Sequence, residues 1–318
     1  MMRRSRAARP LVAVVAGALL ALAGCSPFGA TGDPAAGGAR PSRTGTPAWP
    51  AATPRSGLAK GLVLPLEAYM EPYADTVAVQ QAVDRLTTRC MQRYGYAYTA
   101  PARGMTPPPS SDDSNMPRRY GITDRDQAAR YGYFLGDSGR TPPPAPRLTA
   151  AETAVLTGRL AVAPGAKRAP ARIDGRRIPE DGCLGESIRR VGPRIDESPA
   201  STLDYESLRR SQSDPRVLAV VGAWSRCMKA KGYTVDSPLD AAKLTPDTHH
   251  GQADQADITT ALTDIDCKRR TGLVKTWYTV ESAIQRQQIE QNQFQLQQLK
   301  DRIAAEVKSA MAVLGRNS

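Results

Sequence analysis

Apolar side chains recur at helical spacing in several stretches of the chain, and this pattern predicts a mostly α-helical fold. In the first stretch the apolar positions lie 4, 3 and 4 residues apart, at Val79, Val83, Leu86 and Cys90. Such spacing places the four side chains on one face of a helix. Gly95 is of the residue type that commonly ends a helix, so we expect a helix over about residues 75–94. No stretch of the sequence has a convincing strand pattern.

Capping residues mark the starts of further helices. Asp214 can cap a helix that has Pro215 at its first position and that stops at Gly232. Thr149 and Glu152 have the spacing of a capping box, in which each side chain bonds a free backbone N–H group of the first turn. Helices are therefore expected at residues 149–157 and from Asp214, and shorter ones at residues 123–131 and from Cys183 to about Gly192.

The last quarter of the chain is rich in helix-forming residues. A helix is expected from about Asp257, with a kink or break at Thr271–Gly272. Residues 273–314 contain neither Pro nor Gly, which predicts one helix of roughly 60 Å. Its apolar residues after Ile289 have near-heptad spacing, and this allows two arrangements. The helix either folds back as part of the core, or projects as a coiled coil that binds an envelope protein through residues 289–318.

Residues 1–24 have the pattern of a cleavable export signal. Four arginines precede an apolar run, Leu11–Gly24, which as a helix reaches only about 21 Å, short of the roughly 30 Å hydrocarbon core of a bilayer. The next residue completes the tetrapeptide Leu-Ala-Gly-Cys. It resembles the lipobox of bacterial lipoproteins, in which the cysteine thiol receives a diacylglycerol before cleavage. The resemblance implies that Cys25 anchors the mature chain, because two acyl chains hold a protein stably on a membrane.

Residues 25–58 are expected to be a disordered tether. Residues 26–58 contain six Pro and six Gly among small polar residues, so they offer too little apolar surface for a core. A flexible chain of this length has a reach of roughly 30 Å. The folded part is then expected to have two helical halves, residues 59–200 and residues 201–318.

Two segments of similar sequence lie in the two halves and indicate an internal duplication. Residues 89–96 read Arg-Cys-Met-Gln-Arg-Tyr-Gly-Tyr, and residues 226–233 read Arg-Cys-Met-Lys-Ala-Lys-Gly-Tyr. In both segments the cysteine stands five residues before a glycine that we expect to end a helix. Each half therefore contains one copy of the motif.

The mature chain has four cysteines besides the lipidated one, and an exported protein lies where disulfides persist. Four cysteines permit three pairings. The sequential pairing gives each repeat copy its own disulfide, and it joins Cys90 with Cys183 and Cys227 with Cys267. The second bridge would contribute about 4 kcal/mol in the chain-entropy model. The sequence thus predicts a disulfide-stapled helical domain with long Pro/Gly-rich loops.

The charge of the chain narrows the class of ligand. Removal of residues 1–24 takes away four arginines and no acidic residue, which lowers the formal charge from +12 to +8. A basic protein outside the cytoplasm is attracted to anionic lipids and wall polymers, and its compartment excludes nucleic acid as a partner. The basic segment 167–177, with Arg172, Arg176 and Arg177, is expected to be a solvated loop and is the candidate contact with such a ligand.

Patterns that suggest chemistry are weak. Gly136–Gly139 imitates the nucleophile segment of a serine protease, but no histidine precedes it and no β-barrel is expected. His249 and His250 lack the spacing of a metal site. The clustered tyrosines, which could stack on sugars, are more plausible as core residues: Tyr94, Tyr96, Tyr98, Tyr120, Tyr131 and Tyr133. We therefore expect no enzyme activity, no metal and no cofactor.

Several segments together resemble a family of lipoproteins from actinobacteria. They are the two Cys-Met motifs with Gly-Tyr, Arg119–Ile122 with Tyr131–Tyr133, Gly182–Glu186, Trp224–Met228 and Asp266–Arg270 leading to Leu273 and Val274. The resemblance covers most of residues 75–300. It implies an extracytoplasmic address and a shared set of cysteines, and it assigns no catalytic residue.

The sequence therefore predicts a lipid-anchored protein on the outer side of the cell membrane. We expect it to be an interaction or structural component of the cell envelope. The alternative is a binding module for wall glycan or another anionic envelope ligand.

Overall fold

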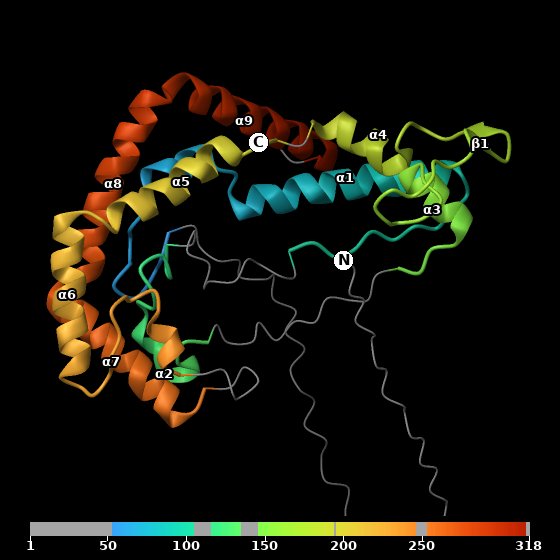
Figure 1. The fold of residues 1–318 in the computed structure, drawn as a ribbon. Helices are drawn as coiled ribbons and strands as arrows, with labels where there is room; N and C mark the ends of the chain where they lie inside the picture. The colour runs from blue at the N-terminus through green and yellow to red at the C-terminus, as the bar shows by residue number, and fades with distance from the viewer. Residues whose placement is uncertain (1–52, 105–115, 135–145, 194, 246–252, 316–318) are drawn as a thin grey trace, which may run out of the picture. The chain divides into compact units, whose positions relative to one another are not determined.

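The expected helices are present, and most begin and end where local sequence signals place them (Figure 1). The computed structural model describes residues 53–104, 116–134, 146–193, 195–245 and 253–315. Two short 3-10 helices are η1 (Pro65–Tyr69) and η2 (Ala241–Leu244), and a small hairpin is formed by β1 (Arg172–Ile173) and β2 (Arg176–Arg177). The α-helices are α1 (Tyr73–Arg93), α2 (Arg125–Tyr131), α3 (Ala150–Thr157), α4 (Gly182–Val191), α5 (Ser198–Ser211), α6 (Pro215–Lys229), α7 (Gln255–Thr271), α8 (Leu273–Gln291) and α9 (Gln293–Leu314).

The predicted caps are confirmed. Asp214 accepts a hydrogen bond from the backbone N–H of Arg216 at 2.9 Å at the start of α6. Thr149 and Glu152 bond each other's backbone N–H groups at the start of α3. Gly272 is left-handed, with φ of 65°, and separates α7 from α8. Local capping chemistry therefore determines these helix boundaries.

The two copies of the repeated motif end their helices with the same hydrogen bonds. In α1 the N–H of Tyr96 bonds the carbonyl of Met91 at 3.2 Å, and in α6 the N–H of Tyr233 bonds the carbonyl of Met228 at 3.1 Å. Each intervening glycine has positive φ, as a Schellman cap requires. Both methionines are fully buried. The shared sequence thus encodes a shared local structure.

Helix α5 was not expected from the sequence. Its buried face is largely polar, because Asp204, Ser207 and Ser211 lie there beside Ala200 and Leu208. A search for apolar periodicity misses such a helix. The polar groups are buried because charged residues of other segments meet them, as described below.

The long C-terminal helix is broken, which corrects the expectation of one continuous helix over residues 273–314. α8 ends at Gln291 and α9 begins at Gln293, and Figure 1 shows a corner between them. Asn292 lies at the break with φ of −119°, and its side-chain amide bonds the carbonyl of Gln288 at 2.8 Å. α8 packs against α5 and α6, whereas α9 packs against α1. A straight helix does not reach both partners.

Helix α9 folds back into the core. Its apolar residues Leu296 and Leu299 are fully buried in a cluster with Leu66 and Ala200. Near its end, Ala310 is buried against Ala82 and other α1 residues. Of the two arrangements open from the sequence, the structure has the one in which the near-heptad stripe packs inside the chain.

The folded part begins earlier than the expected boundary at residue 59. Pro54 is buried, and the backbone N–H of Leu58 bonds the carbonyl of Thr123 at 3.0 Å. The segment around Tyr120 packs with Trp277 of α8, with ring centroids 5.1 Å apart. Residues of the first half therefore lie in the core of the second half, and the described residues belong to one compact unit.

Two disulfides join helices in pairs. Cys90 of α1 is bonded to Cys183 of α4, and Cys227 of α6 is bonded to Cys267 of α7. The sequential pairing expected from the repeat is the one in the structure. Each bridge lies in its own apolar cluster.

Candidate functional site

The basic segment 167–177 contains a β-hairpin where a loop was expected. Arg172 pairs with Arg177 and Ile173 with Arg176 in an antiparallel register. The turn is Asp174–Gly175, and both residues have positive φ, 46° and 74°. Asp-Gly is a preferred sequence for such two-residue turns. The Asp-Gly dipeptide between Ile173 and Ile178 is the sequence signal for this hairpin, and a search for longer strands overlooks it.

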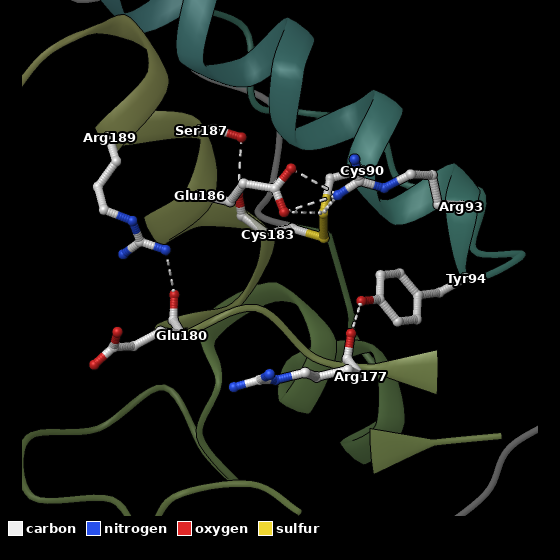
Figure 2. Close-up of a disulfide and its surroundings, with 9 residues drawn as sticks. All are labelled: Cys90, Arg93, Tyr94, Arg177, Glu180, Cys183, Glu186, Ser187 and Arg189. Atoms are coloured by element: carbon white, nitrogen blue, oxygen red, sulfur yellow. Dashed lines mark hydrogen bonds and ion pairs between the residues drawn. A yellow bond between two sulfur atoms is a disulfide. The ribbon is translucent and has the colours of Figure 1, made fainter. Parts of the chain in front are cut away.

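Apolar contacts fix the hairpin on α1 and α4. Ile178 is buried and Ile173 is partly buried in the cluster that contains the disulfide cysteines and Met91. The Tyr94 hydroxyl at the end of α1 donates a hydrogen bond of 2.5 Å to the carbonyl of Arg177 (Figure 2). Arg172 and Arg177 pair on the face opposite to Ile173, and all three arginines of the hairpin, Arg176 included, are exposed.

The disulfide below the hairpin is shielded from solvent. Cys90 and Cys183 are 2% and 0% exposed. Arg93 donates to the Cys90 Sγ at 3.1 Å. Its Nη2 also lies 2.7 and 2.8 Å from the two carboxylate oxygens of Glu186 (Figure 2). A buried, covered disulfide is expected to be a structural bridge. It sets the position of α4 and of the hairpin that precedes it.

A second loop lies beside the hairpin. Arg159 and Arg168 form an antiparallel bridge, and the N–H of Leu160 bonds the carbonyl of Lys167 at 2.9 Å. A cavity of about 420 Å³ lies between the loop and the hairpin, and its lining includes three arginines, Arg159, Arg168 and Arg177. The two loops therefore bring cations from separate segments together.

We call the resulting surface the basic face. It consists of six exposed residues, Arg159, Lys167, Arg168, Arg172, Arg176 and Arg177. Among the described residues, none of the six forms an ion pair with a carboxylate; two of their side chains donate to backbone carbonyls instead. Three acidic residues lie near it: Asp174 in the hairpin turn, and Glu180 and Asp181 in the lining of the cavity, of which Asp181 lies 3.8 Å from Arg189. The basic face thus has a surplus of positive charge, and its six cations form no ion pair among the described residues.

A buried charged cluster lies between α5 and α8 and was not anticipated. Arg119 is 1% exposed and bonds the carboxylates of Asp204, at 2.6 Å, and Glu281. The Tyr120 hydroxyl also donates to Glu281, at 2.7 Å, and burial raises the pKa of this tyrosine well above its usual value. The carboxylates come from residues 85 and 162 positions away from Arg119. Sequence spacing gives no sign of such distant partners.

A second buried pair joins Lys268 and Asp264 on α7 at 3.0 Å, with both side chains 0% exposed. Trp224 donates to Asp264 at 2.8 Å, and Lys268 donates to the carbonyl of Ile122 at 3.0 Å. Burial raises the pKa of Asp264 and lowers that of Lys268. Neither cluster lines one of the cavities described here, so both are interpreted as structural.

A larger cavity of about 820 Å³ lies between α1, α4 and α9. Glu71, Glu197 and Glu306 line it together with apolar residues, and burial raises the pKa of each of these carboxyls. Within the described part of the chain, no group of three or more His, Cys, Asp and Glu side chains is placed to hold a metal ion. The cavity therefore has no assigned ligand.

Several sequence candidates lie outside the described residues: the lipidated Cys25, the protease-like segment 136–139, and His249 with His250. Of the tyrosines considered as a sugar platform, Tyr120 is fully buried, and Tyr94 is engaged with the hairpin. Tyr131 and Tyr133 are partly buried.

Comparison with models of known protein families, with curated proteins and with solved structures finds no match to this chain. Among the described helices, none is both long enough and apolar enough to cross a membrane.

Proposed function

We propose that the chain is a lipid-anchored protein on the extracytoplasmic side of the cell membrane, where it acts as a non-catalytic interaction component of the envelope. In this proposal Cys25 carries the lipid, and the basic face binds an anionic envelope ligand. The lipobox and the two disulfides support the address, because disulfides persist mainly outside the cytoplasm.

The observation that supports the ligand proposal is the surplus of cations without ion-pair partners on the basic face. The backbone that carries three of them, Arg172, Arg176 and Arg177, is held by Ile173, Ile178 and the Tyr94 hydrogen bond. Rigid presentation lowers the entropy that binding costs. Several cations without carboxylate partners attract phosphate-rich polymers and anionic headgroups.

A protein partner that binds through residues 289–318 is the second candidate. The burial of Leu296, Leu299 and Ile303 leaves mainly the polar face of α9 for such a partner. Phe294, which is 77% exposed at the start of α9, is the one large apolar side chain of this helix exposed in the described residues. The basic face therefore remains the favoured surface.

Binding of a soluble polyanion tests the ligand proposal. The mature polypeptide, with Cys25→Ser to remove the lipid, is titrated with poly(glycerol phosphate) by calorimetry at low salt. The triple variant Arg172→Gln/Arg176→Gln/Arg177→Gln should bind roughly a hundredfold more weakly, since each of the three cations near an anionic surface contributes about 1 kcal/mol. Binding should also weaken as salt increases.

A matched control removes the same charge elsewhere. Arg209, Arg210 and Lys229 are exposed on α5 and α6, far from the hairpin in sequence. Their replacement by glutamine should leave the affinity within about twofold. Equal losses in the two triple variants would contradict a specific basic face and would leave only the net charge of the protein.

A further inference from the structure

The loop beside the hairpin has an apolar end that is exposed. Residues 160–164 read Leu-Ala-Val-Ala-Pro, and all five are exposed. Leu160 is 49% exposed and Val162 is 76% exposed. We call this segment the apolar tip. A free apolar loop usually marks an interaction surface.

The apolar tip does not result from a disordered loop end. The N–H of Leu160 bonds the carbonyl of Lys167, and the N–H of Ala169 bonds the carbonyl of Gly158, each at 2.9 Å. Arg159 also donates its side chain to the carbonyl of Ala166 at 3.1 Å. These bonds close the base of the loop and hold the tip away from the core.

Two residues of α4 extend the apolar surface. Leu184 and Ile188 are 36% and 37% exposed, and they line a cavity of about 440 Å³ together with Val162. The tip and these two side chains supply four of the eight large apolar side chains that are exposed in the described residues. Exposed apolar surface is thus concentrated on this one region.

Cations border the apolar tip in sequence and in space. Arg159 precedes it, and Lys167 and Arg168 follow it. At the base of the loop, Arg159 and Arg168 share a cavity with Arg177 of the hairpin, and Glu180 and Asp181 also line it. An apolar segment bordered by cations has the chemistry of proteins that lie at a bilayer surface, with apolar side chains among the acyl chains and cations at the phosphates.

We propose that the apolar tip inserts into the outer surface of the lipid bilayer that holds the lipid anchor, while the basic face contacts its anionic headgroups. This inference rests on the proposed function, because it names the lipid bilayer as the anionic ligand of the basic face. A soluble wall polymer also attracts the cations, but it gives the apolar side chains no medium to enter. The combination of both chemistries therefore favours a bilayer.

The lipid on Cys25 makes a weak contact of this kind effective. If the residues between Cys25 and Pro54 form the tether that the sequence predicts, a chain of this length has a reach of roughly 30 Å. It keeps the domain near the membrane at a high effective concentration, so the tip needs only modest affinity. The protein would then have two contacts with one membrane, and the second would orient the disulfide-stapled domain.

Vesicle binding by the unlipidated mature chain, Cys25→Ser, tests the inference. The probes are vesicles of phosphatidylcholine alone and of phosphatidylcholine mixed with phosphatidylglycerol. We expect binding only to the mixed vesicles, and we expect Leu160→Ser/Val162→Ser to weaken it about tenfold, because both side chains lose their burial in the acyl region. Leu218→Ser on α6, where Leu218 is 56% exposed, is the matched control and should bind like the parent.

A variant that is expected to bind vesicles more tightly gives a test whose positive result misfolding cannot produce. Val162→Trp should bind the mixed vesicles more tightly than the parent, since tryptophan favours the membrane interface. Brominated acyl chains should also quench this added tryptophan. Absence of both effects would overturn insertion of the tip.

The soluble polyanion separates the two proposals. If Leu160→Ser/Val162→Ser leaves vesicle binding unchanged while the arginine variant loses it, insertion is wrong and the basic face stands. If the serine variant binds vesicles more weakly but binds poly(glycerol phosphate) like the parent, insertion is supported. If the parent binds neither probe, both proposals are wrong.

Discussion

At the scale of single residues, the most stringent requirement is the burial of Arg119. This guanidinium is surrounded by Asp204 and Glu281, and Gln285 and Ser207 complete the hydrogen bonds of the two carboxylates. Buried ion pairs are costly to form but more costly to break, because the remaining partner is left charged and unpaired. The cluster therefore specifies how the segment around Arg119 fits between α5 and α8 more than it adds net stability.

We predict that Arg119→Met lowers the free energy of unfolding by about 3–5 kcal/mol, since two buried carboxylates lose their cation. Chemical denaturation followed by circular dichroism measures this change. The control is Arg125→Met, which removes an exposed ion pair with Asp266, with side chains 50% and 36% exposed. It should cost less than about 1 kcal/mol, and a similar loss in both variants would argue against a special role for the buried cluster.

Glu67 gives the fold a pH dependence of predictable sign. The pKa of this carboxyl is raised from 4.5 to about 7, mainly by burial; the backbone N–H of Leu64 and the charge of Arg119 oppose the rise, and the charge of Asp204 adds to it. Between these two pH values the folded chain binds more protons at Glu67 than the unfolded chain does. The contribution of this group to stability is therefore present below pH 4.5 and is lost as the pH rises to about 7.

We predict that Glu67→Gln stabilises the protein at pH 8 by about 1–2 kcal/mol and has little effect at pH 4. Glutamine keeps the side-chain oxygen that accepts the N–H of Leu64 at 3.3 Å. Thermal unfolding across this pH range measures the difference. The exposed Glu290, changed to glutamine, serves as the control, and an equal gain in that variant would refute the assignment to Glu67.

At the scale of elements, the apolar pattern of α9 is compatible with two different structures. Near-heptad spacing suits a projecting coiled coil and equally suits packing on a neighbouring helix. The break at Asn292 turns the chain, and α9 then covers α1 and η1. Deletion of residues 289–318 would consequently remove core residues, so point substitutions give the cleaner tests of this helix.

We predict that Leu299→Ala lowers the free energy of unfolding by about 2–4 kcal/mol, because it leaves a cavity beside Leu66 and Ala200. Phe294→Ala on the same helix should change it by no more than about 0.5 kcal/mol, because Phe294 is 77% exposed. Urea titration of both variants measures the contrast. Equal, small effects would mean that α9 is not part of the core.

At the scale of the whole molecule, lipid anchoring through Cys25 is a proposal that cell fractionation can test. We predict that Cys25→Ala shifts the protein from the membrane fraction to the soluble extracytoplasmic fraction, or stalls it with residues 1–24 uncleaved, because no thiol is left to carry the lipid. Cell fractionation with an antibody measures this. Cys90→Ser/Cys183→Ser is the control: it removes a disulfide and should leave lipid attachment intact. An unchanged membrane fraction after Cys25→Ala would refute lipid anchoring.

The sequence by itself determined the local features of this protein. Asp214, Thr149 and Gly272 delimit helices because capping and left-handed backbone depend on neighbouring residues only. The repeated motif also favoured the sequential pairing among the three possible ones, since that pairing gives each copy its own disulfide. These features involve few residues close in the chain, so their physics can be read from the sequence.

Only the tertiary structure decided which distant segments meet. Arg119 meets the two carboxylates because α5 and α8 pack together. The buried face of α5 is largely polar, so a search for apolar periodicity does not detect it. The break at Asn292 is fixed by the partners of α8 and α9 rather than by a helix-breaking residue. Arg159 and Arg168 likewise meet Arg177 only when the loop and the hairpin lie beside each other, because long-range packing, unlike capping, depends on the whole fold.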